Sequence, residues 1–369
     1  MKKVLLLLLA YLLCLCSGYA QGDGGCFKIN AVNGPTLETN IDFRDYNAFF
    51  FGEFHGVYGV SEIKLALIKY LNQHYGITDV FMETSYSAAY LYNAYLATGD
   101  TSLLLNPMLI YYMKKPYRDF FVKLYQYNKT LANKLKIRGM DFERIEFLKV
   151  LKLLRQQGKE RPKEILPVLL YIDTVTVPEI ARLHSPESYV QNQVYENIRD
   201  SVEKYKGIFR EYYGTNFKVV EDIMFNENIY RKFDKRNKAM YQNMMKEIKK
   251  DGIKKFITFN GMNHGNQNYQ GWKSLCYRLA HNAALKNKLV DIALLCKNCY
   301  DWQLKPEYRY AAFRGPATYR NDTVLINEIY NKYYNSACNY TLIPSDIIDN
   351  PKVKKFSKYL ILMKDQLDF

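Results

Sequence analysis

The chain has 369 residues, of which 48% are hydrophobic, and a formal net charge of +15 at pH 7. This length predicts one large α/β domain or two small ones, with a core large enough to need no metal or disulfide framework. The basic residues are spread along helices and never form a block, so they do not indicate a nucleic-acid-binding protein. Attraction to an anionic cell surface or an acidic ligand fits the charge better.

The N-terminus has the pattern of a cleaved signal peptide. Two lysines precede an unbroken apolar run over residues 4–16, and small residues follow it up to Ala20. The run is too short to span a bilayer, which takes about 20 apolar residues. We therefore expect residues 1–20 to be removed, and residues 21–369 to form a periplasmic or secreted protein with no integral membrane segment.

Strands and helices alternate along the rest of the chain. Short apolar runs that stop at glycine or at polar residues predict buried strands, at residues 47–51, 79–82, 136–138, 255–259, 289–295 and 358–363. Helical periodicity follows the first two of these strands, over residues 61–75 and 86–97, and resumes from about residue 145. This alternation predicts an α/β fold, with a mostly parallel central sheet flanked by helices.

Two helical inserts interrupt this pattern, at about residues 100–135 and 162–250. We expect them to form a cap over the sheet, within a single domain over residues 21–369.

Five cysteines follow the predicted signal peptide, so at least one thiol stays free or pairs outside the chain. Cys296 and Cys299 come after a predicted strand and do not open a helix. A local disulfide or buried thiols in an oxidising compartment are therefore favoured over a redox motif. The sequence has no Cys/His pair at zinc spacing, so we expect no structural zinc.

Polar side chains follow four of the predicted strands, at the point where each strand ends. Glu53 and His55 follow the first, Glu83 the second, Asp141 the third and His264 the fourth. Because ligand sites of open parallel sheets lie at the carboxyl ends of the strands, we expect one site here. A histidine held by a carboxylate can deprotonate water near neutral pH. Two histidines with carboxylates could equally hold a divalent metal that generates hydroxide.

The sequence lacks two common catalytic motifs. It has no Gly-x-Ser-x-Gly elbow, which disfavours a serine esterase of the α/β-hydrolase kind, and no phosphate-cradling glycine-rich loop. Arg236 lies four residues before Met240, on the same side of a predicted helix. Taken alone, Arg236 is a solvated charge near a helix start. In a site it would present donors to an oxyanion or a carboxylate.

Taken in order, these motifs resemble the erythromycin esterase-like and ChaN-like superfamily, which also includes the TraB and Tiki proteins. The resemblance rests on Gly52-Glu53-Phe54-His55-Gly56, the following helix with Glu62, the segments Thr78–Glu83 and Arg138–Asp141, Arg236–Met240, Gly261–His264 and the last strand Tyr359–Met363. The chain departs from the esterase branch in three ways. It has one residue fewer between Glu53 and His55, Gly261 stands in place of a second histidine, and Asn237 replaces the aspartate that follows the arginine.

The resemblance implies a role for each matching residue. His55 would be the base that activates water, Glu53 and Glu83 would orient it or position the water, and His264 and Arg236 would bind the reacting oxygen. Glu62 and Asp141 would contact the substrate.

The branches of the superfamily imply three different functions. The esterase branch needs no metal, so the first expectation is an exported hydrolase that cleaves a small-molecule ester or lactone without a cofactor. The first alternative is a ChaN-like protein that binds haem or iron. The second is a Tiki-like peptidase that depends on a divalent metal.

Overall fold

The computed structural model describes residues 24–30, 34–57, 59–104, 115–155, 159–174, 189–226, 233–265, 273–300, 310–314 and 323–366. The predicted signal peptide lies outside these ranges. Within them, no helix combines the length and the apolar character needed to cross a membrane.

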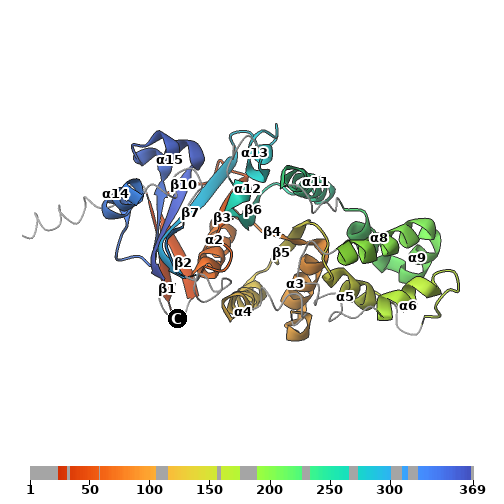
Figure 1. Cartoon of the computed structure of the whole chain (residues 1–369). Helices are drawn as coiled ribbons and strands as arrows, with labels where there is room; N and C mark the ends of the chain where they lie inside the picture. Colours follow the sequence, from red (N-terminus) through yellow and green to blue (C-terminus); the bar gives the residue numbers. More distant parts are fainter. Residues whose placement is uncertain are drawn as a thin grey trace, which may run out of the picture.

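One sheet of ten strands forms the centre of the molecule (Figure 1). The strands are β1 Gly25–Asn30, β2 Gly34–Thr39, β3 Ala48–Glu53, β4 Asp79–Ser85, β5 Lys136–Asp141, β6 Phe256–Gly261, β7 Leu289–Tyr300, β8 Tyr310–Arg314, β9 Tyr340–Pro344 and β10 Tyr359–Gln366. Their order across the sheet is β2-β1-β9-β10-β7-β3-β6-β4-β5, and β8 pairs with β7.

The strands from β10 to β5 in this order are parallel to one another. β8 is antiparallel to β7. All six predicted strands lie in the parallel part, so the predicted α/β fold with a mostly parallel sheet is confirmed. Every residue of β3 is buried, as expected of a strand that is covered on both faces. Because side chains alternate along β3, Phe49 and Phe51 belong to one core cluster and Ala48 and Phe50 to the other.

The opposite edge of the sheet is antiparallel and was not predicted. β1 pairs with β2 and with β9, and β9 pairs with β10. A disulfide between Cys26 and Cys338 ties β1 to the turn before β9.

A second disulfide joins Cys296 to Cys299 near the end of β7, so of the two alternatives, a local disulfide or buried thiols, the structure has the disulfide. Cys276 is a buried free thiol, as the odd number of cysteines requires.

Helices cover both faces of the sheet. They are α2 Val60–Tyr75, α3 Tyr86–Thr98, α4 Lys115–Thr130, α5 Glu146–Leu153, α6 Leu166–Thr174, α8 Tyr189–Lys204, α9 Lys206–Tyr213, α10 Phe217–Met224, α11 Phe233–Asp251, α12 Met262–Gly265, α13 Leu275–Ala280, α14 Thr323–Tyr333 and α15 Pro351–Phe356. α2 packs with the cluster that contains Phe49 and Phe51. α11 packs on the other face, where Met240 and Met244 lie in the core as predicted.

The two helical inserts take different places. The first supplies α4, which packs against α2 and α3. The second supplies the helices from α6 to α10, which pack on one another and on α3 and α5. In Figure 1, α6, α8 and α9 lie beyond the β5 edge of the sheet. α11 then leads the chain back to β6 at the centre.

Candidate functional site

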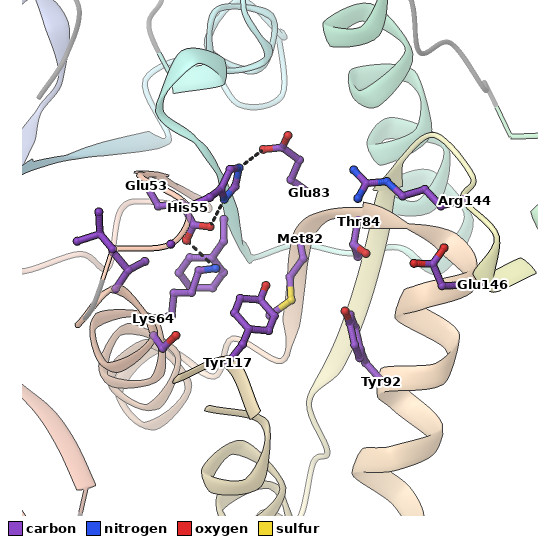
Figure 2. A pocket seen from close by; sticks show the side chains of 15 residues that line it. Glu53, His55, Lys64, Met82, Glu83, Thr84, Tyr92, Tyr117, Arg144 and Glu146 are labelled. Carbon is purple, nitrogen blue, oxygen red and sulfur yellow. Dashed lines mark hydrogen bonds and ion pairs between the residues drawn. The ribbon is translucent and has the colours of Figure 1, made fainter. Parts of the chain in front are cut away.

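A pocket opens at the carboxyl ends of β3 and β4 (Figure 2). Its lining comes from the strand ends and from the first turns of α2, α4 and α5, together with α3. The lining residues are Glu53, His55, Gly56, Val57, Val60, Ser61, Lys64, Met82, Glu83, Thr84, Tyr92, Tyr117, Arg144, Glu146 and Phe259. The predicted site therefore lies where the topology of a parallel sheet requires.

Glu83 is the residue on which the site converges. Its Oε1 accepts a hydrogen bond from Arg236 Nη2 at 2.7 Å and lies 3.2 Å from His264 Nε2. Its Oε2 accepts from the backbone N–H of Gly261 at 2.7 Å and lies 3.5 Å from His55 Nε2. Burial opposes ionisation of Glu83, but the charges of His264 and Arg236 outweigh it and hold the pKa well below its usual range.

His55 and Glu83 approach the end of β6 closely because residue 261 is a glycine. A Cβ atom at this position would lie 2.9 Å from His55 Nε2 and 3.3 Å from Glu83 Oε2. A side chain here would therefore push the histidine and the carboxylate away from the strand end. Gly56, with φ of 82°, turns the chain away from the sheet directly after His55.

His55 lies between two carboxylates, and its side chain is 40% exposed. Nδ1 is 2.9 Å from Glu53 Oε1, and Nε2 faces Glu83. Burial lowers the pKa of His55, but hydrogen bonds to Glu53 and Glu83 and their charges outweigh this effect and raise it to about 10. The His55 imidazole is therefore protonated at neutral pH, and it must lose that proton before it can accept one from water.

Lys64 is a buried cation that the sequence analysis missed. Its Nζ is 2.6 Å from Glu53 Oε2, and the rings of Tyr117 and Phe259 lie within 5.5 Å of it. Burial raises the pKa of Glu53, but the charge of Lys64 and the contact with His55 lower it below its usual value. One signal was available in the sequence, because Lys64 interrupts the apolar face of its helix next to Ile63.

Asp141 holds Arg236 in place. Arg236 Nε and Nη2 donate to the two carboxylate oxygens of Asp141 at 2.9 and 2.6 Å. This fork fixes the plane of the guanidinium, and the two carboxylates raise the pKa of Arg236 despite its burial. The Asp141 side chain is fully buried behind Arg236 and does not line the pocket.

His264 is held in position by Asn237. Its Nδ1 is 2.7 Å from Asn237 Oδ1, which also accepts the backbone N–H of Leu275 at 3.1 Å. Because this oxygen is an acceptor, the proton of the contact belongs to His264 Nδ1. The other ring nitrogen then faces Glu83.

Glu62 takes no part in this cluster. Its Oε2 accepts a hydrogen bond from the hydroxyl of Tyr340 at 2.8 Å, and it does not line the pocket. The structure thus brings six of the seven predicted residues together. They are Glu53, His55, Glu83, Asp141, Arg236 and His264.

The donor set does not fit a divalent metal. In the described part of the chain, no three His, Cys, Asp or Glu side chains are placed to hold a metal ion. Both oxygens of Glu83 already contact N–H donors from Arg236 and Gly261, and a metal ion would have to displace a guanidinium cation.

The fold is shared with proteins of known structure, although no family model and no curated protein matches the sequence. Erythromycin esterase EreC, in an open conformation, superposes with a TM-score of 0.54 and 12% identity, over 89% of this chain and 94% of that chain. A protein from Bacillus cereus superposes with a TM-score of 0.52 and 18% identity, over 87% of this chain and 88% of that chain. A succinoglycan biosynthesis protein superposes with a TM-score of 0.52 and 12% identity, over 87% of this chain and 88% of that chain.

Proposed function

We propose that this protein hydrolyses an ester or a lactone with a water molecule that His55 activates. One observation carries the proposal. His55 borders the pocket with one ring nitrogen on Glu53 and the other facing Glu83, which itself contacts Arg236 and His264. An imidazole oriented by a carboxylate is the usual arrangement of a general base. The fold of an erythromycin esterase adds support.

The proposed reaction begins when His55 loses the Nε2 proton, while Nδ1–H stays hydrogen-bonded to Glu53. The 3.5 Å separation between Nε2 and Glu83 Oε2 is too long for a strong hydrogen bond, so Nε2 can turn to a water molecule. As the water oxygen bonds to the carbonyl carbon, its proton passes to Nε2. The tetrahedral intermediate then breaks its bond to the alkoxy oxygen, which takes the proton from His55.

Arg236, His264 and Asp141 act through Glu83 in this proposal. They keep it ionised and fix its position, so that a negative charge faces the imidazolium that forms during the reaction. Lys64, which lines the pocket and contacts Glu53, would be the cation on the side of the pocket where His55 acts.

The test is hydrolysis of a panel of esters and lactones by the wild type, His55→Ala and a control, His281→Ala. His281 is an exposed residue after α13 and does not line the pocket. We expect His55→Ala to lower kcat/KM by at least about 100-fold and His281→Ala to leave it unchanged. Equal rates for wild type and His55→Ala on every accepted substrate would disprove the mechanism.

We also propose that the protein works after export. The apolar N-terminus motivates this idea, and the two disulfides support it because such bonds persist in oxidising compartments. Mass spectrometry of the protein recovered from the periplasm or medium should give a chain that begins near Gln21. An uncleaved chain that remains in the cytoplasm would contradict export.

A further inference from the structure

The pocket has a second polar end, away from His55 (Figure 2). It is lined by Thr84, Tyr92, Arg144 and Glu146. The proposed hydrolysis uses none of these four residues. The hydroxyl groups of Tyr92 and Thr84 are hydrogen-bonded to each other. Arg144 and Glu146 come from the turn after β5 and the start of α5.

The carboxyl group of Glu146 is buried and only partly satisfied, by the charge of Arg144 and by a hydrogen bond from its own backbone N–H. It is only 3% exposed. Its Oε2 has no hydrogen-bond partner among the described residues. A glutamate in the first turn of a helix normally interacts with the helix start while it faces water. A buried polar oxygen without a partner is unfavourable, so a group that enters the pocket would be its natural partner.

The charges at this end restrict what that group is. Burial raises the pKa of Glu146, and the neighbouring charge of Arg144 opposes this effect only in part. Glu146 therefore holds a proton more readily than an exposed glutamate and can both donate and accept. A carboxylate ligand would be repelled by ionised Glu146, and an ammonium ligand by Arg144. A neutral hydroxyl group, which also donates and accepts, suits both neighbours.

We propose that Glu146, with Arg144 beside it, binds a hydroxyl group of the substrate, so that the pocket selects esters or lactones that carry a free hydroxyl. This inference rests on the proposed hydrolysis. Met82, Tyr117 and Phe259 line the pocket as well, and their apolar surfaces would contact the carbon skeleton that joins the hydroxyl to the reacting carbonyl. Glu146 is a specificity residue in this view and does not touch the reacting atoms.

The test uses γ- and δ-lactones with one hydroxyl, each paired with the lactone that lacks it. The quantity measured is the ratio of kcat/KM within each pair, for wild type, Glu146→Met and Glu146→Gln. Methionine removes the hydrogen bond and keeps the volume, whereas the glutamine amide still donates and accepts. Glu62→Met is the matched control, because it also removes a carboxylate from the first turn of a helix but lies outside the pocket.

We expect the wild type and Glu146→Gln to favour the hydroxylated member of at least one pair by about 10- to 100-fold. Glu146→Met should lose this preference, and Glu62→Met should keep it. A purely structural role of Glu146 would lower both rates of a pair equally in Glu146→Met and leave the ratio unchanged, which would overturn the proposal. A wild type without a preference in any pair would overturn it too.

A separate binding measurement distinguishes this proposal from the proposed hydrolysis. Cyclic ethers with and without the same hydroxyl lack the reacting carbonyl, so their effect on thermal stability reports binding alone. If no lactone is hydrolysed, the proposed function fails, while selective stabilisation of the wild type by hydroxylated ethers, absent in Glu146→Met, would still support the hydroxyl site. Equal responses to both ethers would remove that support.

Discussion

The protonation of His55 can be tested without any substrate. Glu53 and Glu83 raise its pKa from the ordinary 6.5 to about 10. If the two carboxylates share this effect, replacing either one by glutamine should lower the pKa of His55 by about 1 to 2 pH units, because one nearby opposite charge usually accounts for 1 to 3. The 40% exposure of His55 lets solvent screen both contacts and places the expected change near the lower value.

The measurement is an NMR titration of the imidazole Cε1–H resonance between pH 5 and 11, assigned by its loss in His55→Gln. Glu83→Gln tests the carboxylate that Arg236 and His264 also contact. Glu53→Gln leaves Lys64 buried without its ion pair, so the double variant Glu53→Gln/Lys64→Met should accompany it.

Two results would refute this reasoning. The first is a wild-type midpoint near 6.5, and the second is a midpoint that neither substitution lowers. The raised pKa of His55 also makes the stability of the folded protein depend on pH. Because the pKa of His55 is higher in the folded state, its contacts stabilise the protein fully below about pH 6.5 and lose this effect as the pH rises toward 10. Ester hydrolysis should rise over the same interval, as His55 becomes able to accept a proton.

Three further predictions concern the scaffold around the site. Arg236→Met should lower the free energy of unfolding by about 3 to 5 kcal/mol, because it leaves the buried Asp141 carboxylate without its main partner; an equal urea midpoint for variant and wild type would contradict this. Gly139→Ala should cost about 3 kcal/mol or more in the same measurement, since its Cβ would lie 2.2 Å from the backbone oxygen of Ser85, and a soluble variant of normal stability would show that the two strands can separate. Burial raises the pKa of Glu143 to about 8 in the folded protein, so stability should fall as the pH rises from about 4.5 to 8. Glu143→Gln should remove that part of the pH dependence, and parallel stability curves for variant and wild type would disprove the assignment.

The sequence was sufficient for the parallel part of the fold. Continuous apolar runs such as Phe49–Phe51 and Ile292–Leu295 are typical of strands that are covered on both faces. β1 and β2 gave no such signal. The last three residues of β1 are all exposed, and the two strands contain glycine and proline, which are typical of loops.

The strand-end residues of the site were predictable for the same reason, whereas the helical ones were not. Glu62 and Lys64 show why. Two positions along a helix differ by about 200° around its axis, so only one of the two side chains can face the pocket. The resemblance favoured Glu62 as the residue that contacts the substrate. In the structure Lys64 lines the pocket instead, and Glu62 faces Tyr340. Glu146 was missed because an acidic residue at a helix start is normally an exposed charge that favours the helix N-terminus.

The position of β1 has a consequence for how the chain folds during synthesis. β1 is made first among the strands, but its neighbour β9 is made almost last, and Cys26 emerges 312 residues before Cys338. Pairings so distant along the chain form slowly, because a long loop must close first. Until β9 arrives, Cys26 is exposed to Cys276, Cys296 and Cys299 as alternative partners. A disulfide isomerase in the compartment where the protein folds would therefore raise the yield of native protein, and replacing Cys26 and Cys338 together should remove that requirement.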